Sequence, residues 1–248
     1  MTTATAPAAS WPMFHSKLVV REEVAERTIA FHFEKPANWS FKAGQFIDLT
    51  ILSPPETDAE GNKRGFSIAS APDEPTIMVA SRMRDTAFKR SLQTIPLGSI
   101  ATIEGPFGNL TLHDNAERTA IILAGGIGIT PFRSILIDAA RHRRPQRILV
   151  FYSNRRPEDA PFLDELLTLQ NSNYRLVATM TEMAKSNRSW SGETGMIDEA
   201  LLSRHWSDIR SPIYYIAGPP EMVKGLHATL NRNGAYDEDI RTEEFTGY

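Results

Sequence analysis

Short apolar runs, separated by Pro, Gly, Asn and Asp, fill the first half of the chain. Within residues 27–33, Ile29, Phe31 and Phe33 occupy every second position, which is the period of a half-buried strand. Turn-forming residues between such runs are typical of an antiparallel barrel or sandwich. The predicted strands are residues 17–20, 27–33, 46–52, 66–69, 77–80 and 100–103, with a helix near 86–93 and an exposed loop at 53–63.

From residue 118 onward, continuous apolar runs alternate with segments of helix length. This rhythm predicts a parallel sheet with helices on both faces. The predicted strands are residues 120–124, 148–152, 174–180 and 213–217, and the helices 130–141, 157–170, 197–205 and 220–231. We therefore expect a disordered tail at 1–12, a six-stranded Greek-key antiparallel β-barrel at 13–115 and an α/β domain at 116–248.

Composition narrows the classes of function. The net charge of −3 gives no global basic field for nucleic acid. The sequence has no run of ~20 apolar residues, so no membrane span is expected, and the small polar start does not resemble a signal peptide; a cytoplasmic protein is expected. A basic cluster at residues 141–147 is either a solvated helix end or a docking surface for an acidic partner.

The sequence contains no cysteine. This excludes disulfides, thiolate metal sites and cysteine-ligated iron–sulfur clusters within these residues. No metal site is expected.

A glycine-rich turn follows the strand predicted at 120–124. Its glycines are Gly125, Gly126 and Gly128, and Thr130 and Pro131 come next, at the start of a predicted helix. Glycines allow backbone amides to approach a ligand, and a helix N-terminus favours an anion. Thr130 is expected to be the helix N-cap. The turn predicts a pyrophosphate cradle, although a packing turn has the same composition.

A second turn, Gly218-Pro219-Pro220, also joins a predicted strand to a predicted helix. Ligands of open parallel sheets bind outside the carboxyl ends of the strands. We therefore expect this turn to face the first one across a single crevice.

In the barrel half, Arg64, Phe66 and Ser67 stand within four residues. A guanidinium, an aromatic ring and a hydroxyl suit a phosphate, a planar ring and a ring nitrogen, respectively. Taken alone, the same residues also fit an ordinary strand with a buried Phe.

The order of these motifs resembles the ferredoxin–NADP reductase family from about residue 15 to residue 248. The motifs are Phe41-x-x-Gly44-Gln45-Phe46, Arg64-x-Phe66-Ser67, Gly105-Pro106-x-Gly108, Gly125-Gly126-x-Gly128-x-Thr130-Pro131, Gly218-Pro219-Pro220 and the terminal Glu243-Glu244-Phe245-x-Gly247-Tyr248.

The resemblance implies a role for each matching position. Arg64 pairs with the pyrophosphate of FAD, Phe66 stacks on the isoalloxazine, and Ser67 hydrogen-bonds near N5, which receives hydride. The rest of the FAD is expected to contact Val79, Ser81, Arg82, Thr86 and Lys89. The dinucleotide is expected to contact Gly125, Gly126, Gly128, Thr130, Pro131, Ser153, Arg155, Gly218 and Pro219. Lys89 departs from the Ser of many relatives, and Ala217 from their Cys beside the nicotinamide.

The resemblance also places a carboxylate and an aromatic lid at the flavin. Of Glu243 and Glu244, Glu244 is predicted to be the catalytic carboxylate. Phe245 is the first choice for the lid, and Tyr248 is the alternative.

The implied reaction is hydride transfer from NADH or NADPH to FAD, followed by electron release to a separate acceptor. That acceptor is a ferredoxin, a flavodoxin, an oxygenase component or a small molecule. NADH is favoured, because Thr179 and Met180 stand where NADP-selective relatives place a Ser-Arg pair; Arg155, Arg156, Lys185 and Arg188 argue the other way. Two alternatives stay open: a non-catalytic module that senses redox state, and an electron-transfer subunit of a larger complex.

Overall fold

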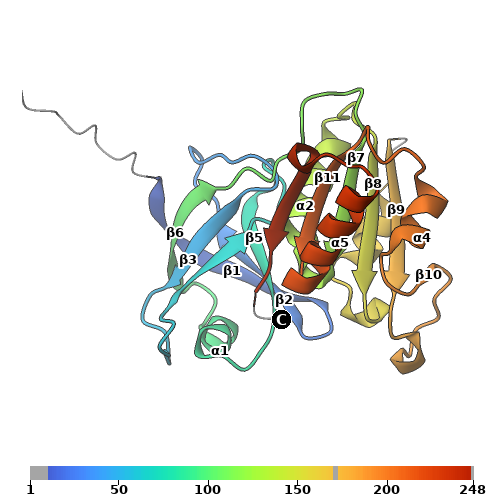
Figure 1. Cartoon of the computed structure of the whole chain (residues 1–248). Coiled ribbons are helices and arrows are strands. Elements are labelled where there is room, and N and C mark those ends of the chain that lie inside the picture. The colour runs from blue at the N-terminus through green and yellow to red at the C-terminus, as the bar shows by residue number, and fades with distance from the viewer. Residues whose placement is uncertain (1–10, 170–172, 247–248) are drawn as a thin grey trace, which may run out of the picture.

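The computed structural model of the protein describes residues 11–169 and 173–246. It contains two six-stranded sheets, an antiparallel one from the first half of the chain and a parallel one from the second, lying side by side in Figure 1. The fold class predicted from the sequence is confirmed. Of the predicted tail at 1–12, residues 1–10 lie outside the described residues.

The antiparallel sheet has the strand order β4-β3-β6-β1-β2-β5. Its edge strands β4 and β5 meet where the amide of Ala69 donates to the carbonyl of Met78 at 2.7 Å, which closes the sheet into a barrel. The elements are β1 (Met13–Ala25), β2 (Thr28–Glu34), β3 (Phe46–Ile51), β4 (Lys63–Ser67), β5 (Thr76–Arg82), α1 (Ala87–Thr94) and β6 (Ile100–Phe107).

Two barrel strands differ from their predicted ranges. β1 extends from Met13 to Ala25 instead of covering only residues 17–20, because its second half pairs with β2 through charged, largely exposed positions that an apolar pattern does not mark. β4 ends at Ser67 instead of Ala69, since Ala69 leaves β3 to bond β5 across the closure.

The parallel sheet has the order β10-β9-β8-β7-β11-β12. Its strands are β7 (Ala120–Gly125), β8 (Ile148–Asn154), β9 (Tyr174–Met180), β10 (Glu193–Thr194), β11 (Ile213–Gly218) and β12 (Ile240–Glu244), and its helices are α2 (Thr130–Arg141), α3 (Leu163–Thr168), α4 (Glu199–His205) and α5 (Pro220–Arg232). Successive residues of β7 face opposite sides. Ile122 packs with α2 and α3, and Ile121 with α4 and α5; Figure 1 shows α5 in front of the sheet and α2 behind it.

The helix predicted at 157–170 is wrong as a single element. The chain instead forms a 3₁₀ turn at Pro157–Asp159 and then α3. Phe162, with φ of 60°, precedes α3 in the left-handed region, and a helix cannot run through that conformation. Residue 170 lies outside the described residues.

Strands β10 and β12 carry few apolar residues, so an apolar pattern alone does not mark them as members of the sheet. Within residues 11–169 and 173–246, no helix is both long and apolar enough to cross a membrane.

Candidate active site

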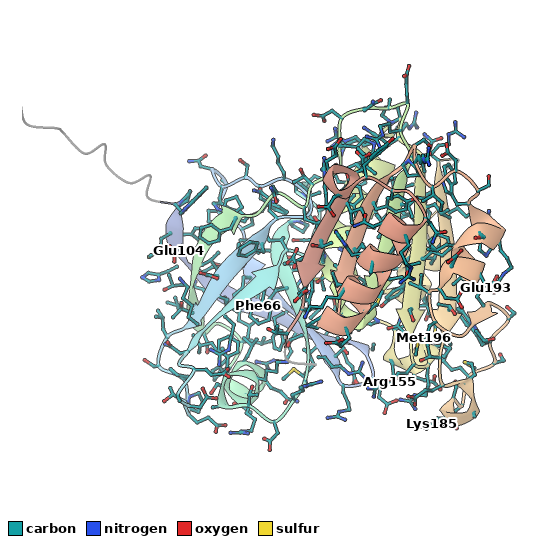
Figure 2. The ribbon with its side chains drawn as sticks, in the orientation of Figure 1. Phe66, Glu104, Arg155, Lys185, Glu193 and Met196 are labelled. Carbon is teal, nitrogen blue, oxygen red and sulfur yellow. The ribbon has the colours of Figure 1, made fainter. Side chains whose placement is uncertain are left out.

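A cavity of about 430 Å³ lies at the junction of the two sheets, and we call it the junction cavity. It brings together most of the predicted flavin motif and the start of α2. Figure 2 shows Phe66 in this region. The lining includes Arg64, Phe66, Ser67, Ser81, Arg82, Thr86 and Lys89 from the barrel half, and Ile127, Thr130 and Phe245 from the other half.

Both arginines of the junction cavity already have acidic partners. The Nη2 of Arg64 lies 2.7 Å from Glu60 Oε2, and its guanidinium stacks 5.1 Å from the Phe88 ring centre. Arg82 pairs at 3.0 Å with Asp159, whose side chain is 5% exposed. Asp159 belongs to the turn after β8, and nothing in the sequence around it marks it as a partner of Arg82.

Lys89 differs from the two arginines. Its Nζ donates to the carbonyl of Arg82 at 2.8 Å. Burial lowers the pKa of Lys89 to about 8, and the positive charges of Arg84 and Arg64 act in the same direction. Lys89 is thus a cation that loses its proton within an accessible pH range.

Two other predicted FAD contacts have defined places. Thr86 is the N-cap of α1, where its side chain accepts from the amide of Lys89. Val79 is fully buried within the barrel core and does not line the junction cavity, so only its backbone is left for a ligand.

A hydrogen bond joins the barrel motif to the last strand. The hydroxyl of Ser67 donates to Glu243 Oε1 at 3.1 Å. Burial raises the pKa of the Glu243 carboxyl, and the hydrogen bond from Ser67 acts in the opposite direction. The carboxylate that meets Ser67 is therefore that of Glu243, whereas Glu244, the predicted catalytic residue, is exposed on the other side of the strand.

A second cavity, of about 460 Å³, adjoins the first and is called the outer cavity. Phe66, Ser67 and Phe245 line both cavities, and Glu244 lines the outer one. Phe245 is held in place by its amide, which donates to the carbonyl of Gly218 at 2.9 Å. Tyr248, the alternative lid, lies outside the described residues.

The glycine-rich turn forms a 3₁₀ helix at Gly126–Ile129 that leads directly into α2. Gly126 has φ of 54°, and a Cβ on Gly128 would lie 2.4 Å from the carbonyl oxygen of Ala217. The prediction of Thr130 as N-cap is wrong. Thr130 is the first residue of α2, and its hydroxyl donates to the carbonyl of Ile127 because the 3₁₀ turn continues the helix backwards; Pro131 follows within the first turn.

The two Gly/Pro turns face each other. β11 ends at Gly218, and a Cβ there would lie 3.2 Å from the backbone of Gly125. Pro219 precedes α5 directly. The backbones of the two turns are thus in close contact, and of their glycines and Pro219 only Gly126 and Pro219 are partly exposed.

Beyond these two turns, Ser153 near the end of β8 lines a third cavity, of about 550 Å³, together with Met196 and Met222. Figure 2 shows Met196 and Arg155 at this end of the parallel sheet. The Arg155 side chain is 69% exposed and lies 3.9 Å from Glu182. Arg156 is engaged by Asp159 and Glu26, both at 2.7 Å.

The positions used to compare nucleotide preference need correction. Thr179 and Met180 are buried inside β9, so their side chains cannot face a ligand beyond the strand. Thr181 and Glu182 are the residues that follow the carboxyl end of β9. The strand predicted at 174–180 already contains both residues, and aligning on the shorter apolar run 174–178 placed the loop positions two residues too early.

In the described part of the chain, no group of three or more His, Asp or Glu side chains is arranged to hold a metal ion.

Comparisons with known proteins agree with this geometry. Residues 122–228 match the family model of the oxidoreductase NAD-binding domain. The chain is 30% identical to the propane 2-monooxygenase reductase component of Mycolicibacterium smegmatis, over 86% of this chain and 61% of that protein. It is 26% identical to the glycine betaine monooxygenase reductase subunit of Chromohalobacter salexigens, over 92% of this chain and 62% of that protein. The chain thus spans about three fifths of the length of these relatives.

Solved structures share the fold. A ferredoxin NADP⁺ reductase from Neisseria gonorrhoeae with bound FAD and NADP superposes with a TM-score of 0.79 at 24% identity, covering 94% of this chain and 98% of that one. The ferredoxin reductase in carbazole 1,9a-dioxygenase superposes with a TM-score of 0.79 at 20% identity, covering 96% and 71%.

The close approach of Gly128 to Ala217 gives a test of the packing between the two glycine turns. We expect Gly128→Ala to lower the free energy of unfolding by about 1–3 kcal/mol, because the backbone of β11 must move away from the new methyl group. Urea denaturation measures this change. The control is Gly225→Ala in α5, where a Cβ meets nothing within 4 Å and where alanine is expected to stabilise the helix by up to about 1 kcal/mol. Equal effects of the two substitutions would show that the two glycine turns are not tightly packed against each other.

Proposed function

Because the chain belongs to the ferredoxin reductase-like oxidoreductases, we propose that it transfers hydride from NADH or NADPH to a bound FAD. The observation that carries this proposal is the junction cavity, which is lined both by the barrel motif and by the start of α2. Residues 13–115 are proposed as the FAD-binding domain and residues 116–248 as the nucleotide-binding domain.

The side chains of the junction cavity fit FAD. Arg64, Arg82 and Lys89 offer charge to a pyrophosphate, and Phe66 offers a flat apolar face to a ring system. Ser81 and Thr86 add hydroxyl groups. When bound, FAD supplies the ring that accepts hydride and passes electrons onward.

The two glycine turns are proposed to bind the nicotinamide dinucleotide. Gly125, Gly128 and Gly218 are buried and let the turns pack closely. The partly exposed Gly126 and Pro219 are proposed to meet the pyrophosphate, whose negative charge the N-terminus of α2 favours. Thr130 and Pro131 hold the first turn of α2 at this place. Ser153 and the cavity beside it are proposed to take the adenosine half.

Ser67, Glu243 and Phe245 are proposed to act at the reacting rings. The Glu243 carboxylate orients the Ser67 hydroxyl, which lies in the wall shared by both cavities. Phe245, which lines both cavities, would cover a bound flavin and would have to give way to nicotinamide. Glu243 takes the place that the sequence alone assigned to Glu244.

Electrons are proposed to leave to a separate acceptor, an oxygenase component or its ferredoxin. This is supported by relatives that are reductase components of monooxygenases. A cytoplasmic site of action is proposed because reduced nicotinamide nucleotides are cytoplasmic substrates.

The purified protein is expected to bind one FAD and to be bleached by reduced nucleotide under anaerobic conditions. We expect kcat/KM to favour NADH by about tenfold, because a 2′-phosphate near Glu182 would meet a carboxylate whose neighbouring cations, Arg155 at 3.9 Å and Lys185 at 2.7 Å, are already paired with it. Cofactor extraction and stopped-flow absorbance with both nucleotides measure this. FMN alone in the extract, or a bound flavin that neither nucleotide reduces, would refute the function. A tenfold preference for NADPH that Arg155→Ala abolishes would refute only the nucleotide preference.

FAD affinity is expected to fall as pH rises above about 8, the value to which burial lowers the pKa of Lys89. Above that pH the amine is increasingly neutral in the free protein, so binding the pyrophosphate must take up a proton; below it the affinity is flat. Isothermal titration calorimetry of FAD into the FAD-free protein measures this affinity between about pH 6 and 10, which is roughly two units either side of the pKa. Lys89→Arg, which stays charged, should remove the dependence. The same slope in Lys89→Met would exclude Lys89 as its source.

Flavin reduction is expected to slow as pH falls through the pKa of Glu243, which burial raises above the ordinary value of 4.5. A protonated carboxyl no longer acts solely as an acceptor for Ser67, so the orientation of the hydroxyl is lost. Stopped-flow reduction rates across pH should show this acidic limb in the wild type and in Glu244→Gln, but not in Glu243→Gln. An unchanged limb in Glu243→Gln would assign it to another group.

A further inference from the structure

Arg133 is a buried cation in α2, one turn after Thr130, and only 6% of it is exposed. Its Nη1 donates to the carbonyl of Ala69 at 2.8 Å and to Glu74 Oε2 at 3.0 Å. Its Nε and Nη2 donate to the two carboxylate oxygens of Glu165 at 2.7 and 2.6 Å. The ring of Phe162 lies 5.1 Å from the guanidinium carbon.

The partners of Arg133 come from both halves of the molecule. Ala69 and Glu74 belong to the barrel half, in the segment that follows Ser67, whereas Glu165 lies in α3. The next residue adds a second bond across the same boundary, since the Ser134 hydroxyl donates to the carbonyl of Ser70 at 2.7 Å. Figure 1 shows α2 at the junction with the barrel.

These contacts sit very near both cofactor motifs along the chain. Ala69 is separated from Ser67 by a single residue, and Arg133 is about 5 Å along a rigid helix from Thr130. Without a fixed contact, the two halves of the molecule would be expected to move relative to each other. A fixed contact here therefore sets where the glycine turn lies relative to Phe66 and Ser67.

We infer that Arg133 is a positioning residue that sets the alignment of nicotinamide and flavin by clamping α2 to the segment after β4. The inference rests on the proposed function. Its contacts with Glu74 and with the Ala69 carbonyl cross the boundary and provide the alignment, while its contact with Glu165 stays within one half and keeps the buried charge paired. Removing either carboxylate from the buried pair is destabilising, but of the two carboxylates only Glu74 contributes to the alignment.

The test compares Glu74→Gln with Glu165→Gln, because both remove one negative charge from the same guanidinium. In Glu74→Gln the amide oxygen is still able to accept from the amide of Ala71, as Glu74 does. Arg133→Lys keeps the charge but loses the fork of donors, and Arg204→Lys is its control, because the Arg204 side chain is 53% exposed and pairs at 2.8 Å with Glu193 of the same half. Readouts on the FAD-loaded proteins are the reduction rate at saturating NADH, the charge-transfer absorbance with NAD⁺ and the Kd of FAD.

We expect Arg133→Lys and Glu74→Gln to slow flavin reduction by about tenfold or more and to weaken the charge-transfer band, because small misplacements of reacting groups are costly. The Kd of FAD should change less than about twofold. Glu165→Gln and Arg204→Lys should keep the reduction rate within about twofold of wild type.

Equal slowing by Glu74→Gln and Glu165→Gln, or an unchanged rate in Arg133→Lys, would overturn the inference while leaving the proposed function intact. The wild-type protein separates the two claims: if neither nucleotide reduces its flavin, the proposed function fails, and the inference fails with it.

Discussion

The parallel pairing of β12 with β11 is the constraint on which the candidate site depends. It sets Glu243 beside Ala217 and Glu244 beside Gly218, and the bond from Phe245 to Gly218 continues the pairing beyond the strand. Because side chains alternate along a strand, a shift by one residue would exchange the faces of Glu243 and Glu244. The contact between Ser67 and a carboxylate, and the place of Phe245 between two cavities, both follow from this register.

The parts of the fold that are predictable from the sequence are those where burial leaves little choice of residue. β9 and α2 have their predicted bounds, since a strand covered on both faces is continuously apolar and an amphipathic helix repeats its apolar positions. β12, with the sequence Ile-Arg-Thr-Glu-Glu, lies at the sheet edge and has largely polar, partly exposed positions. Its pattern therefore resembles that of a loop.

The candidate site was predictable in its motifs but not in its pairings. The glycine turns and the residues Arg64, Phe66 and Ser67 are marked by composition and order. The choice between Glu243 and Glu244 depends on a register that only tertiary structure fixes, and the partnership of Arg82 with Asp159 joins segments far apart in the chain. The N-cap of α2 was mispredicted because a 3₁₀ turn, which has no distinct sequence signature, extends the helix.

The cations of the junction cavity are compensated before any ligand arrives. Arg64 is paired with Glu60 and Arg82 with Asp159, while Lys89 donates to the carbonyl of Arg82 and burial lowers its pKa. A phosphate entering the cavity therefore exchanges one ion pair for another, and few bound counterions are released. Added salt screens the old pairs as well as the new ones, so the cavity has little attraction for small free anions, and selectivity among phosphorylated compounds passes to the aromatic surface of Phe66 and Phe245.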